Sequence, residues 1–226
     1  MLAEIRAGIT TMSDGTVAPA RASRMGAMTT GDAQGRYYEQ ASRGNIFSLV
    51  MTASATNAPA ANNLLSGLAA AGAVSFALWN PAGSGKNISL LKLGVMPISG
   101  TPPVGGLWHG VMATCPTIAS NIAAAAVGYL TCNNVGMAAA SVARGVVTAA
   151  GGTALTGCSI PSILRMADLN LSAGTLASAN SNGVKAVEYI DGDIVLPPGT
   201  GWCPVWSTAG TTFLFGMSLT WEEIPI

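Results

Sequence analysis

From residue 45 onward, the chain alternates short apolar runs with clusters of turn-forming residues. Apolar side chains in several of these runs, such as 73–79 and 88–98, fall at every second position, which is the period of a half-buried strand. Clusters of Gly, Pro, Asn and Ser separate the runs about every ten to fifteen residues. This spacing is typical of a sandwich or barrel of antiparallel strands. We therefore expect an all-β domain over residues 45–226, with strands in 45–53, 73–79, 88–98, 106–114, 125–131, around Pro161, and in 184–190, 193–198, 203–208 and 212–224.

The first 44 residues lack this pattern. They are rich in Gly, Ser, Thr, Ala and Arg, and no apolar period is sustained over two helical turns. We expect an extended arm over residues 1–44 that is mobile in a free monomer and ordered against the surface of another protein. Two Ala-rich segments inside the β region, 60–72 and 117–127, fit either a short helix or a loop.

The charge content narrows the class of protein. Charged residues make up 9% of the chain, against about 25% in an ordinary soluble domain. Either a membrane or a surface covered by other subunits explains such a deficit. The best candidate span, Leu64–Trp79, is rich in Ala and Gly and falls short of the roughly 20 apolar residues that a span needs. We therefore expect no membrane segment, and we expect a homo-oligomer.

The sign and placement of the charges exclude further partners. Lys and Arg number 10, Asp and Glu number 10, and no carboxylate occurs between Glu39 and Asp168. A nucleic-acid-binding protein normally carries a basic patch, so we expect no nucleic-acid partner. Glu4, Arg6 and Asp14 near the start also do not fit the apolar core of a secretory signal.

The stretch "LWNPAGSGKNI" at residues 78–88 has the glycines and the lysine of a phosphate-binding loop. That motif requires a glycine five residues before Gly85-Lys86 and a Ser or Thr after the lysine. Asn80 and Asn87 occupy those two positions, and the residues that follow alternate like a strand instead of opening a helix. We therefore expect no nucleotide site, and we interpret the stretch as a β-hairpin connection in which Gly83 and Gly85 adopt positive φ.

Catalytic and metal signatures are equally sparse. Glu188, Asp191 and Asp193 form the densest acidic group, which predicts a solvated turn at Asp191-Gly192, with a calcium site as the alternative. His109 has no G-x-S-x-G serine to serve, so we expect a packed or interfacial histidine. These patterns predict a protein that is not an enzyme and that has no cofactor and no resident metal.

Cysteines and tryptophans each leave two interpretations open. No two cysteines form a CxxC pair, so reduced, semi-buried thiols are favoured over a Cys115–Cys132 bridge across a hairpin. Tryptophans at strand ends favour a core or subunit interface, and stacking on sugars is the alternative. The cysteines are Cys115, Cys132, Cys158 and Cys203, and the tryptophans are Trp79, Trp108, Trp202, Trp206 and Trp221.

Three stretches together resemble a known type of protein: "GRYYEQASRGNIFSLV", "LWNPAGSGKNISLLKLGV" and "GDIVLPPGTGWCPVW", followed by the closing strand "SLTWEEIPI". With the Arg-bearing arm before them, they are similar to small virion structural proteins of tailed bacteriophages. The likeness covers most of residues 30–226 and lies in the texture of turns and strands.

The resemblance implies a jelly-roll-like β-sandwich that forms a trimer and decorates or cements the major capsid protein. It implies a location on the capsid surface of the virion, after assembly in the host cytoplasm. The alternative is a tail-fibre or head-fibre receptor-binding module of the same fold. The arm is the part matched to capsid contact, through five arginines: Arg6, Arg21, Arg24, Arg36 and Arg43.

Overall fold

The computed structural model of the protein describes residues 37–50, 56–57, 76–99, 106–113, 130–136, 139–147, 160–167, 186–206 and 214–226. The chain divides into two units, Met1–Glu39 and Gln40–Ile226. The Ala-rich segments 60–72 and 117–127 and most of the expected arm, residues 1–36, lie outside the described residues. The extended conformation of the arm therefore stays a prediction.

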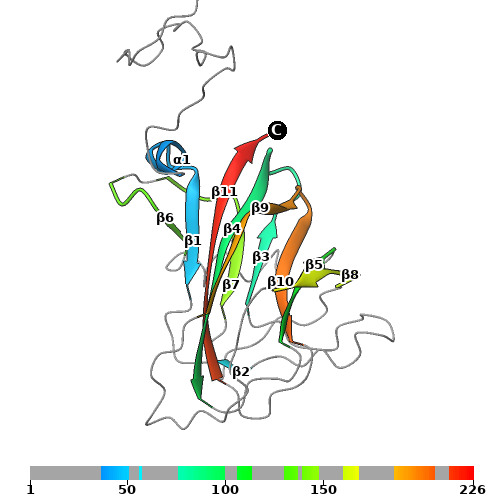
Figure 1. The fold of residues 1–226 in the computed structure, drawn as a ribbon. Coiled ribbons are helices and arrows are strands. Elements are labelled where there is room, and N and C mark those ends of the chain that lie inside the picture. The colour runs from blue at the N-terminus through cyan, green and yellow to red at the C-terminus, as the bar shows by residue number, and fades with distance from the viewer. Residues whose placement is uncertain are drawn as a thin grey trace, which may run out of the picture. The chain divides into compact units, whose positions relative to one another are not determined.

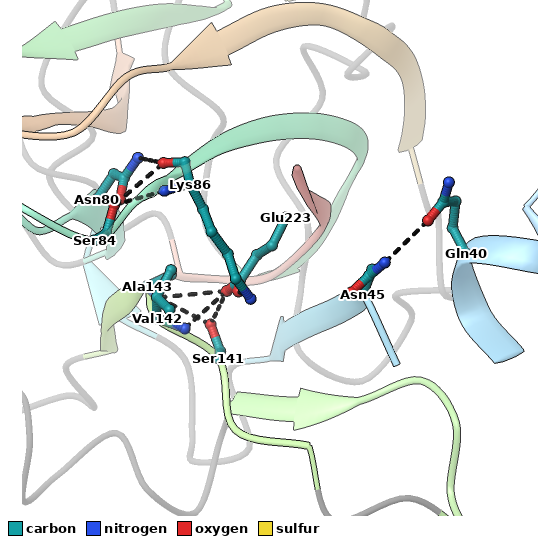
Figure 2. Close-up of polar contacts among 9 residues, drawn as sticks. All are labelled: Gln40, Asn45, Asn80, Ser84, Lys86, Ser141, Val142, Ala143 and Glu223. Carbon is teal, nitrogen blue, oxygen red and sulfur yellow. Dashed lines mark hydrogen bonds and ion pairs between the residues drawn. The ribbon is translucent and has the colours of Figure 1, made fainter. Parts of the chain in front are cut away.

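One short helix, α1 (Tyr38–Ser42), occupies residues that the sequence placed in the extended arm. Gly44 lies two residues after the helix ends, and its φ of 74° is the left-handed conformation that glycine adopts there at little cost. The amide of Gly44 donates to the carbonyl of Ala41, and the amide of Asn45 to that of Gln40. The Asn45 side chain adds a 3.1 Å hydrogen bond to Gln40 Oε1 (Figure 2).

The described strands form two antiparallel sheets, as the sequence predicted (Figure 1). The β11 sheet has the order β6 (Leu130–Cys132), β1 (Ile46–Val50), β11 (Leu214–Pro225), β4 (Lys86–Ser99) and β9 (Ala186–Leu196), and β2 (Thr56–Asn57) also pairs with β11. The β10 sheet has the order β7 (Arg144–Val147), β3 (Phe76–Asn80), β10 (Thr200–Trp206), β5 (Leu107–Met112) and β8 (Ser162–Met166).

Eight of these strands pair in a nested order. The first pairs with the last, β1 with β11, and the second with the last but one, β3 with β10. The inner pairs are β4 with β9 and β5 with β8. The pairs β1·β11 and β4·β9 lie in the β11 sheet, and the pairs β3·β10 and β5·β8 lie in the β10 sheet. The chain therefore follows the path of a long antiparallel ribbon rolled into two layers, with β6 and β7 added between β5 and β8.

The inner faces of the two sheets meet in one apolar core. Trp206 of β10 packs edge-on against Phe215 of β11, with 5.4 Å between the ring centroids, and this contact joins the two layers. Trp202, Trp206 and Trp221 are fully buried, which confirms the core interpretation for these three tryptophans.

In the described part of the chain, no helix is long and apolar enough to cross a membrane.

The connection 81–85 corrects one sequence expectation. Gly83 and Gly85 have φ values of 77° and 69°, as predicted for this turn. The hairpin interpretation is wrong, however, because β3 belongs to the β10 sheet while β4 pairs with β11 and β9. The glycines turn the chain from one layer to the other.

The segment around Asp191-Gly192 is a second correction. Both residues have positive φ, 55° and 90°, as a turn would require, yet β9 continues through them from Ala186 to Leu196. The register against β4 jumps from Leu90↔Ile194 to Lys92↔Tyr189. The extra residues form a bulge within one strand, so the two strands predicted over 184–190 and 193–198 are one.

Candidate functional site

Buried carboxylates lie at two places in the described part of the sandwich. The first, which we call the Glu223 clasp, comprises Glu223, Lys86, Ser141 and the backbone amides of Val142 and Ala143 (Figure 2). The second, which we call the His109 cluster, comprises His109, Glu188, Arg165 and Trp202. Each joins segments that are far apart in the sequence.

In the clasp, the fully buried Glu223 carboxylate uses both of its oxygens. Oε1 accepts hydrogen bonds from Ser141 Oγ at 2.5 Å, from the amide of Val142 at 3.0 Å and from that of Ala143 at 3.4 Å. Oε2 accepts from Lys86 Nζ at 2.9 Å. The charge of this carboxylate is thus balanced by one cation and by three neutral donors, which offsets the cost of its burial.

The clasp binds part of the chain between β5 and β8. In this part of the chain, β6 pairs with β1 in the β11 sheet, and β7 pairs with β3 in the β10 sheet. The segment from 139 to 143 leads into β7, and Glu223 of β11 binds its amides. At this margin of the sandwich, a buried carboxylate therefore holds the segment that leads into β7.

Asn80 joins the layers at the end of β3. Its Nδ2 donates to the carbonyl oxygen of Lys86 at 2.8 Å (Figure 2). It also donates to the carbonyl oxygen of Leu196 at 2.8 Å, so the side chain links the start of β4 to the end of β9. The side chain is fully buried. Asn80 occupies the position where a phosphate-binding loop would have glycine, and Lys86 of the same stretch pairs with Glu223.

The His109 cluster lies between the layers at the opposite margin. His109 of β5 is fully buried, and its Nε2 lies 3.0 Å from Glu188 Oε2 of β9. Glu188 Oε1 accepts from Arg165 of β8 at 2.6 Å. Arg165 also lies 3.3 Å from Asp193 Oδ2 through its Nε. The cluster connects β5 and β8 of one sheet with β9 of the other.

The hydrogen bonds of the ring define its tautomer. Trp202 Nε1–H can only donate, and it lies 3.0 Å from His109 Nδ1, so that nitrogen is the acceptor. Nε2 must then carry the proton that it donates to Glu188. The geometry therefore describes a neutral imidazole protonated at Nε2, held between a donor and a carboxylate.

Two opposing causes act on the pKa of Glu188. Desolvation by burial raises the pKa, while the hydrogen bonds and charges of His109 and Arg165 lower it, and the net pKa is below the ordinary glutamate value. Glu188 is therefore ionised at neutral pH, and its ion pair with Arg165 persists into mildly acidic solution.

This arrangement is suited to holding the layers together. A general base needs a ring nitrogen that can reach a substrate proton. Both nitrogens of His109 already have partners inside the protein, and the ring is closed off from solvent. In this conformation the cluster acts as a structural link, in agreement with the packed histidine that the sequence favoured.

The acidic group of the sequence is divided by the fold. Glu188 points into the cluster and is 4% exposed, whereas Asp191 and Asp193 are exposed on the bulge of β9. In the described residues, no three His, Cys, Asp or Glu side chains gather as a metal-binding group would. The alternation of buried and exposed residues along β9 explains the division, because side chains two apart share a face.

Of the five arginines predicted to contact the capsid, the structure describes Arg43. Arg6, Arg21, Arg24 and Arg36 lie outside the described residues. Arg43 is exposed, one residue after α1 ends. Their role in capsid contact stays a prediction.

Two of the four cysteines are described, and both are free thiols. Cys132 therefore takes no part in the bridge to Cys115 that the sequence left open. Cys203 is completely buried, and desolvation raises the pKa of its thiol to about 12. Such a thiol stays protonated and packs as a small apolar side chain.

The chain was compared with protein-family models, with curated proteins and with solved structures, and none of them matches it.

Proposed function

We propose that the protein is a non-enzymatic structural component of a bacteriophage particle, a jelly roll that binds the major capsid protein as a trimer and stabilises the shell. The observation that carries this proposal is the nested pairing of β1·β11, β3·β10, β4·β9 and β5·β8. A jelly roll is an eight-stranded double sheet of two Greek keys, and viral capsid and lectin domains use it. A rolled ribbon of eight strands produces nested pairs of this kind.

The use of charge supports a role in assembly. Two ion pairs of the described residues form internal links, Lys86 with Glu223 and Arg165 with Glu188, in a chain with only 20 charged residues. The strands meanwhile present apolar side chains to solvent, including Val50 of β1, Met96 of β4 and Ile224 of β11. Association of copies covers such side chains without burying unpaired ions.

The arm supplies the contact with the shell in this proposal. Its five arginines, Arg6, Arg21, Arg24, Arg36 and Arg43, provide donors for carboxylates and carbonyls of the capsid protein. Because the arm precedes the sandwich in sequence, changes in it leave the pairing of β1 with β11 intact.

The test mixes full-length protein with purified empty capsids and measures co-sedimentation and the thermal stability of the shell. Replacement of the five arm arginines by alanine is expected to abolish or strongly weaken attachment while the circular dichroism spectrum stays unchanged. The matched control replaces the same five by lysine, which retains the charge. Analytical ultracentrifugation is expected to show a trimer. A monomer at micromolar concentration, or a protein indifferent to capsids, contradicts the proposal.

A fibre-type receptor-binding role is the second candidate, and two tryptophans favour it. Trp79 and Trp108 occupy the outer face of the β10 sheet and are half-buried, unlike the three core tryptophans. Partly exposed indole rings stack on sugars as well as on proteins. Quenching of tryptophan fluorescence by host surface glycan, lost in Trp79→Ala and Trp108→Ala, favours this role over capsid binding.

A further inference from the structure

The two margins of the sandwich end differently in the described part of the chain. At one margin the short strands β6 and β7, of 3 and 4 residues, complete the two sheets. At the other margin the sheets end in β8 and β9, and β9 is 11 residues long. We call the strands β8 and β9 the open margin. A long strand at the end of a sheet is a template on which a strand of another molecule can pair.

Apolar side chains on the open margin would favour such pairing. Leu164 and Met166 of β8 are 50% and 60% exposed, and Tyr189 and Val195 of β9 are 67% and 49% exposed. These exposures place both strands in contact with solvent. High β-propensity and apolar side chains at a sheet edge promote association of strands.

Charged side chains that point between the sheets lie on the same two strands. Glu188 of β9 and Arg165 of β8 form their ion pair at 2.6 Å, and the Arg165 side chain remains 35% exposed at the rim. A strand added along β8 or β9 would cover this rim and remove the remaining water from the guanidinium. Both strands also carry register irregularities, after His109 opposite β8 and after Leu90 opposite β9. Bulges and inward-pointing charges are two means by which proteins protect sheet edges.

We infer that the Arg165–Glu188 ion pair guards the open margin against strand pairing with a second copy of this chain. The ion pair thus keeps a protein with exposed apolar edge residues from polymerising through its sheets. This inference rests on the sheet edges alone and is independent of the proposed capsid role.

The test compares two double variants of the full chain. Arg165→Met/Glu188→Gln removes both charges of the ion pair, while Asp191 and Asp193 of β9 keep theirs and the Gln oxygen still accepts from His109. The control, Lys86→Met/Glu223→Gln, makes the equivalent change at the covered margin, where the Lys86 side chain is 29% exposed. Net charge is unchanged in both, because each loses one cation and one carboxylate. Light scattering, thioflavin T fluorescence and amide exchange of residues 187–195 follow association beyond the native oligomer.

The open-margin variant is expected to associate at a protein concentration about tenfold lower than either the control or the unmodified protein, a difference equivalent to about 1.4 kcal/mol. Its β9 amides gain protection on association. If the double variant does not fold, Arg165→Met alone is compared with Lys86→Met and with Arg165→Lys, which keeps the charge. Equal association in the open-margin and covered-margin variants overturns the inference, as does an Arg165→Lys variant that associates as readily as Arg165→Met.

Discussion

Trp202 Nε1 donates to His109 Nδ1 across 3.0 Å, and this contact determines which nitrogen of the buried ring carries the proton. The two residues lie on neighbouring strands, β10 and β5, and the ring centroids are 5.8 Å apart. With Nδ1 occupied as an acceptor, Nε2 donates to Glu188 on the other sheet. A tryptophan in the core therefore orients a hydrogen bond between the two layers.

The first prediction concerns this donor. Trp202→Phe removes the indole N–H and leaves Nδ1 of a fully buried histidine without that partner, which costs about 1–3 kcal/mol beyond the loss of ring volume. Trp221→Phe is the matched control, since Trp221 is equally buried and its Nε1 has no hydrogen-bond partner among the described residues. Urea unfolding measures both, and nitrogen NMR of the unmodified protein should show the Nε2–H tautomer. Equal losses in the two variants would refute the role of the indole donor.

The second prediction concerns the pH dependence that Glu188 contributes. Its folded-state pKa lies below the unfolded value, so the unfolded chain binds this proton more readily. The stability due to Glu188 is therefore present above the unfolded pKa of about 4.3 and is lost as pH falls through the folded pKa. Glu188→Gln should lower the free energy of unfolding at pH 7 by about 1.5–3 kcal/mol, the value of a hydrogen bond to a charged group. The difference should shrink at lower pH.

Glu222 provides the control of opposite sign for this pH prediction. Desolvation raises the pKa of its carboxyl, so ionisation of this residue opposes folding as pH rises through the folded pKa. Glu222→Gln should therefore leave stability at pH 7 unchanged or slightly increased. A loss at pH 7 as large as that of Glu188→Gln would contradict the assignment of the stabilising carboxylate to the His109 cluster.

The third prediction concerns the Glu223 clasp. Glu223→Ala leaves the amides of Val142 and Ala143 and the Lys86 ammonium without their buried acceptor, at a cost of about 3–5 kcal/mol. Ser141→Ala removes a single donor and should cost about 1 kcal/mol. Amide exchange is the sharper measurement, because residues 142–147 should lose protection before β4 and β11 do. Uniform loss of protection over all strands would show that the clasp does not act on β7 in particular.

The alternating pattern predicted the strands well and predicted their pairing not at all. Runs such as 88–98 and 212–224 became β4 and β11, because period-2 alternation reflects one buried face. The strand β7 (Arg144–Val147) was not predicted, because the stretch "RGVV" is too short to show a two-residue period. The turn at 81–85 was placed correctly, yet positive φ at two glycines is compatible with a hairpin and with a crossing between layers. Only the long-range pairs distinguish the two.

The buried polar groups were the least predictable part. The sequence placed Glu188 in an acidic group beside a solvated turn and indicated no role for Glu223. Neither sequence neighbourhood indicates a partner 79 or 137 positions away. The one usable signal was placement, since Glu188 falls on the same side of its strand as the apolar Ile190 and Ala186. A carboxylate in phase with the buried positions of a strand predicts a buried partner. For Asn80 the only indication was its position just before Pro81, at the end of a strand.

The fourth prediction concerns the close packing at Gly201 in the centre of the β10 sheet. A Cβ at this position would lie 2.6 Å from Trp79 Cε3, 2.8 Å from Met112 Cε and 2.9 Å from the carbonyl oxygen of Leu78. Because the last of these is backbone of the paired strand β3, the clash cannot be relieved by a rotamer change alone. Gly201→Ala should therefore destabilise the protein by about 1–3 kcal/mol, as overpacking of a core does.

Gly136→Ala is the control, since the nearest atom to its added Cβ is Asn134 Oδ1 at 3.8 Å, and it should change stability by less than about 0.5 kcal/mol. Thermal unfolding of both variants checks the difference, and the partly exposed Trp79 should report the strain at Gly201 as a shift in its fluorescence. A neutral Gly201→Ala variant would mean that β3 and β10 are not in the observed register.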